Sequence, residues 1–180
     1  ILFCSVFSHT REWFQKRIGN PRLRIFLGGV ILLGLSLVFS SGRYNGTGME
    51  VITAAIEKGQ AYGWDFLLKI LFTGITLGVG YKGGEVVPSF FVGATFGCFV
   101  GPALGIPAGF AAAVGLISVF CGVVNCPLAS IFLSVELFGA QGILFFALAC
   151  GLSYVLSGYG GIYSSQRILY DKLKAQYIDV

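Results

Sequence analysis

The stretch Tyr81–Gly97 reads "YKGGEVVPSFFVGATFG" and places a lysine, two glycines and a glutamate directly before a strongly apolar run. Gly83 and Gly84 carry no Cβ, and Pro88 suits a first helical turn, where its missing N–H leaves no further group unpaired. We predict that a helix begins here, and a helix start has the geometry to hold an anion. An ordinary helix entry is the alternative. The backbone N–H groups expected to stand open are those of Glu85, Val86 and Val87.

The composition around this stretch is that of a membrane protein. Of the 180 residues, 56% are hydrophobic and 11% are charged, whereas about 25% are charged in soluble domains. The mean hydropathy is +0.83. The 27 glycines suit closely packed membrane helices. We therefore predict an all-α, polytopic protein of the cell membrane, and the first residues, without an initiator Met or a signal-peptide pattern, suggest a piece of a longer protein.

Glycine and proline punctuation divides the apolar sequence into short helices. The breaks are "GPALGIPAG" (101–109), "NCP" (125–127), "FGAQG" (138–142) and "SGYGG" (157–161). The segments between them are roughly 11 to 18 residues long, whereas about 20 are needed for a perpendicular span. The sequence predicts short, tilted and broken transmembrane helices. Broken helices of this kind build ion sites in transporters.

Basic residues flank the first apolar run. Residues 9–24 contain one acid and five basic residues, and residues 25–40 contain no charge. By the positive-inside rule, we predict a cytoplasmic basic linker over 1–24 and a membrane domain over 25–180. A nucleic-acid or lipid-surface patch is the less favoured alternative, because a membrane helix follows at once; we expect no nucleic-acid partner. The polar, basic end of the chain is a second cytoplasmic candidate.

Asp65, Lys69, Glu85 and Glu136 are charged residues within or beside apolar runs. Asp65 and Lys69 lie four apart and are expected to pair or to reach the membrane interface. Glu85 is either a stabilising helix cap or a proton carrier on an anion path. Glu136 looks buried near a helix end, where we favour a structural role over proton transfer.

The sequence predicts no enzyme, metal site or cofactor. Five cysteines are scattered without C-x-x-C spacing and are read as small buried hydrophobes. His9 lies in the basic flank, and no Ser–His–Asp pattern is evident.

Glycines recur every four residues after the opening stretch and predict a close helix crossing; they are Gly93, Gly97, Gly101 and Gly105.

The glycine-opened helix, the short helices after it and a late "GGIYSS" (160–165) together resemble the CLC family of anion channels and anion/proton antiporters. The resemblance runs from about Arg22 to the end and is strongest from Tyr81 to Ser165. It implies that residues 25–180 are the C-terminal half of a CLC transmembrane domain. That half is the second of two inverted repeats, and a similar-sized half carrying the family's gating glutamate would precede it.

The resemblance also implies a site. CLC proteins hold an anion with backbone amides of a Gly-x-Phe-x-Pro motif and with a tyrosine hydroxyl. Gly84–Pro88 occupies the motif here, with Val86 in place of the phenylalanine, and Tyr163 matches the tyrosine. A Gly-Glu-Val sequence looks like the fluoride/proton antiporter branch, in which the glutamate lies on the anion path and a threonine commonly stands where this chain has a valine. The implied anion-binding residues are Gly84, Glu85, Val86, Val87 and Tyr163, with Glu85 also the proton-coupling candidate.

The function expected from this resemblance is fluoride export coupled to protons. A chloride channel or chloride/proton antiporter of the same family is the first alternative, and a non-transporting membrane scaffold is another. The family also implies a homodimer, through helices near 125–138 and 142–156. Their bulky apolar faces are equally compatible with lipid.

Overall fold

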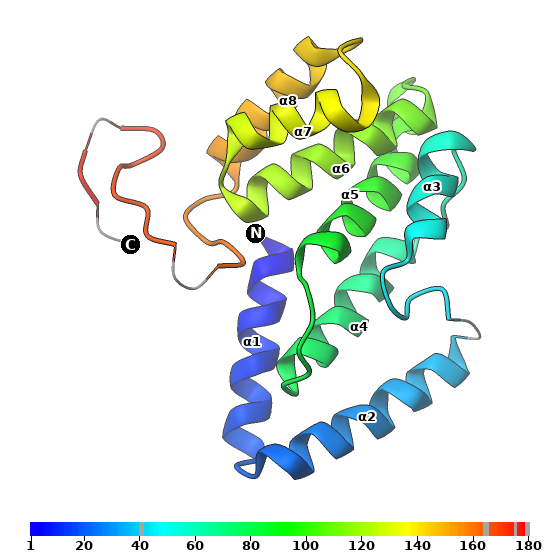
Figure 1. Cartoon of the computed structure of the whole chain (residues 1–180), viewed down its shortest axis with the longest axis vertical. Coiled ribbons are helices and arrows are strands. Elements are labelled where there is room, and N and C mark those ends of the chain that lie inside the picture. The colour runs from blue at the N-terminus through cyan, green and yellow to red at the C-terminus, as the bar shows by residue number, and fades with distance from the viewer. Residues whose placement is uncertain (40–41, 164–165, 175, 179–180) are drawn as a thin grey trace.

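The structure is a computed structural model that describes residues 1–39, 42–163, 166–174 and 176–178. Within these ranges the regular elements are all helical (Figure 1). The one β-type pairing among them is an isolated bridge between Tyr170 and Tyr177. The predicted all-α fold is confirmed. The helices are Leu2–Arg17 (α1), Pro21–Val38 (α2), Met49–Glu57 (α3), Asp65–Gly78 (α4), Val86–Val100 (α5), Gly101–Leu104 (η1, a 3-10 helix), Ala108–Val124 (α6), Pro127–Phe138 (α7) and Ile143–Leu156 (α8).

Helix α5 is the centre of the fold. Figure 1 shows it running between α4 and α6, with α1 against α4 and with α7 and α8 beyond α6. The core is built where α5 and α6 meet, around the fully buried Phe91, Ala94 and Ile117. The helix that begins at the opening stretch is thus held on two sides by neighbours far apart in the sequence.

Glycines allow α5 and α6 to cross at backbone contact. A Cβ added at Gly93 would overlap the Gly115 carbonyl, and one at Gly97 would overlap the Ala111 carbonyl. Gly101 meets the Ala111 side chain in the same way. The predicted packing ridge is confirmed at these three glycines. It is wrong at Gly105, where a Cβ would meet nothing within 4 Å and where φ of +73° ends η1.

The helices are short, as the punctuation predicts. Among the described residues, two helical stretches are long and apolar enough to cross a membrane, Pro21–Val38 and Val86–Leu104. Three apolar helices are shorter: α6, α7 and α8. The break at 101–109 is confirmed, because η1 ends at Gly105 and Pro107 precedes α6.

The first 24 residues are largely helical and packed. Helix α1 occupies most of the segment for which the sequence predicts a linker, and it packs along α4 through residues such as Phe3 and Val6. The hydroxyl of Thr10 donates to the Gly74 carbonyl at 3.1 Å, and the glycines at 74 and 78 leave room for α1. The helix that α1 packs against lies far along the chain, so the basic composition of residues 1–24 alone does not reveal this packing.

Asp65 is fully buried and does not pair with Lys69. Its carboxylate accepts two hydrogen bonds from Arg43, at 3.1 and 2.7 Å, and one from the Tyr44 hydroxyl at 2.7 Å. The backbone N–H of Tyr62 donates to it at 2.9 Å. A buried charge is stable only when it is paired and hydrogen-bonded in this way. The expectation that Asp65 and Lys69 pair with each other is therefore wrong, because Arg43 and Tyr44 before α3 and the Tyr62 N–H after it supply the partners of Asp65.

Lys69 is also buried, at 1% exposure, one turn further along α4. Its ammonium donates to the carbonyls of Tyr44 at 3.1 Å and Gly46 at 2.7 Å, and lies 5.0 Å from the centre of the Phe91 ring. Together, Asp65 and Lys69 tie the loop at residues 43–46 to α4 and α5.

Helices α7 and α8 present apolar side chains outward. Phe132 on α7 is 75% exposed, and Leu144 and Leu148 on α8 are exposed to a similar degree. These helices match the predicted dimer segments in position. The described residues after α8 form no helix, and the Lys172 ammonium holds them to the end of α8 by donating to the Tyr154 carbonyl at 2.9 Å.

Candidate functional site

The candidate site is the turn between α4 and α5. Helix α4 ends at Gly78, Gly80 adopts φ of +104°, and the chain then runs to Glu85, which precedes the first residue of α5, Val86. Pro88 lies in the first turn of the helix and is buried. The predicted helix start is confirmed (Figure 1).

The first amides of α5 are unpaired within the described structure. The first helical bond across the start runs from the Ser89 N–H to the Glu85 carbonyl at 3.2 Å. No described residue accepts a hydrogen bond from the N–H groups of Glu85, Val86 or Val87. A Cβ at Gly84 would meet nothing within 4 Å, so there is open space beside the residue that precedes these amides. Unpaired N–H groups at the positive end of a helix dipole favour an anion.

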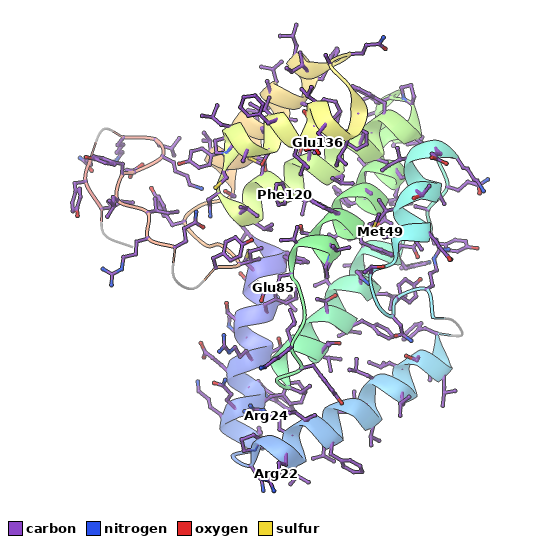
Figure 2. All side chains as sticks on the ribbon, in the orientation of Figure 1. Arg22, Arg24, Met49, Glu85, Phe120 and Glu136 are labelled. Carbon is purple, nitrogen blue, oxygen red and sulfur yellow. The ribbon has the colours of Figure 1, made fainter. Side chains whose placement is uncertain are left out.

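A cavity of about 540 Å³ lies on one side of this turn. It is lined by α1, the start of α2, the 77–85 segment and residues 161–162. Figure 2 shows Glu85 beside α1 and Arg24 at the start of α2. Three basic residues and one acid face this space, so its field attracts anions. The charged lining residues are Arg11, Arg24, Lys82 and Glu85.

A second cavity of about 350 Å³ touches the same turn. Gly83 lines both cavities, whereas Gly84, Val87 and Pro88 line the second. The buried Lys69 is in its wall. The turn therefore separates two spaces, with the Glu85 side chain on one and Val87 on the other. Val86 is partly buried and lines neither.

The structure brings the neighbours of Tyr163 to the cavity, and not Tyr163 itself. Gly161 and Ile162 line the larger cavity together with Glu85, and the Ile162 N–H donates to the Val123 carbonyl at 3.0 Å. The Tyr163 side chain is 46% exposed and lines neither space. The two serines that complete the "GGIYSS" match, 164 and 165, lie outside the described residues.

Glu136 lies apart from this site. It is exposed in the last turn of α7, and Figure 2 places it well away from Glu85. The expectation of a buried acid is wrong for the described structure, because the outer face of α7 has no covering helix.

Arg11 and Arg24 line the larger cavity, although the sequence assigns them only to a basic cytoplasmic flank. The sequence contains a signal for this arrangement, because the α1 residues that line the cavity are spaced three or four positions apart and so lie on one face of a helix. They are Cys4, Phe7, Ser8, Arg11 and Gln15.

A sequence model of the family described as voltage gated chloride channel matches residues 1–158. The chain belongs to the voltage gated chloride channel family. Members of this CLC family are multi-pass integral membrane proteins that conduct or transport anions and are not enzymes, so the membrane character and the anion chemistry are family properties.

Two CLC relatives cover nearly the whole chain. A protein of Pseudomonas syringae pv. tomato (strain ATCC BAA-871 / DC3000), named chloride/fluoride channel protein, is 37% identical, and the match covers 96% of this chain and 39% of the relative. A solved structure, described as the crystal structure of a CLC-type fluoride/proton antiporter, is 34% identical with a TM-score of 0.87. The match covers 90% of this chain and 41% of the chain in that structure. The all-α CLC fold is confirmed, and the chain spans about two fifths of each of these CLC proteins.

Proposed function

We propose that this chain is the C-terminal half of a CLC transporter that exports fluoride in exchange for protons across the cell membrane. The observation that carries the proposal is the group of unpaired amides at the start of α5, beside a basic cavity that contains Glu85. Residues 1–24, and with them the basic wall, face the cytoplasm in this proposal. The descriptions of both relatives include fluoride, which supports the choice of ion.

The proposed chemistry follows from hydration. Fluoride loses strongly favourable hydration on entering a membrane protein, so aligned donors must replace water. The amides of Glu85 and Val86 and the Tyr163 hydroxyl are the proposed donors, and Gly84 and Val87 shape the turn around them. Glu85 takes up a proton as the anion passes. This scheme needs Tyr163 to turn toward the site in the whole protein, where the other half packs against this one.

Vesicles that contain the full-length parent test the proposal directly. We expect fluoride efflux to exceed chloride efflux, and an imposed pH gradient to drive fluoride uphill. Equal fluxes of the two halides would support the chloride channel or chloride/proton antiporter, which the family name and the word chloride in the relative's name favour. If no halide flux were detected, the result would favour the non-transporting membrane scaffold.

Tyr163→Phe is expected to weaken fluoride binding about ten- to hundredfold, because a hydrogen bond to a charged partner contributes roughly 1.5–3 kcal/mol. Titration of the parent protein with fluoride measures the change. Tyr170→Phe, on the same exposed segment, is the control and should bind as the wild type does. An unchanged titration for Tyr163→Phe would remove the hydroxyl from the site.

The proposed transporter is a homodimer through α7 and α8. Their exposed leucine and phenylalanine side chains supply an apolar surface that a second copy would cover. The mass of the detergent-solubilised parent tests this arrangement, since a particle with the mass of a single chain would contradict it.

A further inference from the structure

Helix α2 is poorly buried, but it meets the candidate site at its first turns. Gly28 is the α2 residue that is buried. A Cβ added there would lie 2.5 Å from the Val79 side chain, and one added at Gly29 would lie 2.8 Å from the Tyr81 hydroxyl. By contrast, a Cβ at Gly34, further along the same helix, would meet nothing within 4 Å. The close approach is therefore local to the residues that follow α4.

Two hydrogen bonds accompany this approach. The Arg24 Nε donates to the Val79 carbonyl at 3.0 Å, and the Tyr81 hydroxyl donates to the Ile25 carbonyl at 3.2 Å. Both connect the first turns of α2 to the end of α4, across more than fifty residues of sequence. They hold the backbone on either side of Gly80, whose φ of +104° turns the chain toward Glu85.

The same residues reach the Glu85 cavity. Arg24, Gly80 and Tyr81 line it together with Gly83 and Glu85. The segment between Tyr81 and α5 has no regular structure and contains two glycines. Its course depends on where its first residue is held, because glycines restrict the backbone little.

We propose that Tyr81 is a positioning residue for the anion site: its bond to the Ile25 carbonyl, in the space left by Gly29, sets where the turn presents Glu85 and the first amides of α5. The inference rests on the proposed function, because it assigns a role at the same site. It makes α2 part of the anion-binding apparatus. A purely packing role for the same contacts would alter the amount of folded protein and leave its affinity for fluoride unchanged.

Fluoride efflux from vesicles containing the full-length parent, measured over a range of fluoride concentrations, tests the proposal. Gly29→Ala and Tyr81→Phe should each raise the half-maximal fluoride concentration about two- to tenfold, as expected for the loss of one hydrogen bond. Gly34→Ala is the matched control, the same substitution on the same helix in open space, and should leave it unchanged. Size-exclusion profiles report the folded amount separately.

A double variant makes the geometry specific. In Gly29→Ala combined with Tyr81→Phe, the new methyl no longer meets a hydroxyl, and the next ring atom, Cζ, is 4.0 Å away. The pair should therefore be no worse than Tyr81→Phe alone, a non-additive result that two independent packing defects would not produce. Half-maximal concentrations equal to that of the wild type in both single variants would overturn the inference while leaving the transport proposal intact. A parent that moves no halide overturns both.

Discussion

Glu85→Gln in the full-length parent is expected to separate fluoride movement from proton movement. The substitution keeps the size of the side chain and removes the group that can carry a proton in the cavity. The amides of α5 are backbone groups and stay in place, so fluoride can still bind. We expect the proton flux per fluoride to fall to near zero, because an amide side chain cannot take up and release the proton as a carboxyl group can.

The measurement pairs a fluoride electrode with a pH-sensitive dye inside the vesicles. Glu136→Gln is the matched control, because it makes the same change at an exposed acid on α7, away from the cavity. It should leave coupling unchanged. Coupled exchange at the wild-type ratio in Glu85→Gln would remove Glu85 from the proton path and leave it only the electrostatic role of a carboxylate at the positive end of a helix, since its side chain makes no capping hydrogen bond.

Gly97→Val is expected to prevent the parent from folding normally. Any side chain at this position would overlap the backbone carbonyl of Ala111 on α6, and a backbone atom cannot swing aside as a flexible side chain can. The two helices would have to separate along the surface that buries the core. Overpacking of this kind destabilises by about 1–3 kcal/mol, and we expect the upper end here.

Thermal stability and the monodisperse fraction after detergent extraction measure this effect. Gly34→Val, at a helical glycine with open space around it, is the control and should extract as the wild type does. Gly97→Ala should give an intermediate loss, because it adds only the Cβ. A stable, monodisperse Gly97→Val protein would show that the α5–α6 crossing is looser than described.

The start of α5 follows from the sequence, because Gly83, Gly84 and Pro88 predict it. Helix α2 begins four residues before the apolar run at 25–40, at Asn20 and Pro21, where the Asn20 side chain accepts from the Arg22 N–H at 3.1 Å. Such signals act within one turn of chain, where glycine, proline and capping groups have the same effect in any fold. The four-residue glycine repeat likewise predicts a close crossing, although not the partner helix.

The environment of the charged residues does not follow from the sequence. Asp65 and Lys69 lie one turn apart, which suggests that they pair with each other. Instead, Arg43 donates to the Asp65 carboxylate, and the Lys69 ammonium donates to the carbonyls of Tyr44 and Gly46. Glu136 looks buried among apolar neighbours and is exposed. In each case, the deciding contact is made, or is missing, between segments distant along the chain.

The candidate site shows the same division. Its amide donors are a local property of the sequence between Gly83 and Pro88, since the first N–H groups of a helix have no partner within that helix. The basic cavity around Glu85 exists only because α1 packs on α4 and α2 bonds to the turn, which bring Arg11 and Arg24 to residues more than fifty positions later. Local chain geometry sets where the helix begins, and tertiary packing sets which charges surround that beginning, because electrostatic fields depend on distance in space and not on separation in sequence.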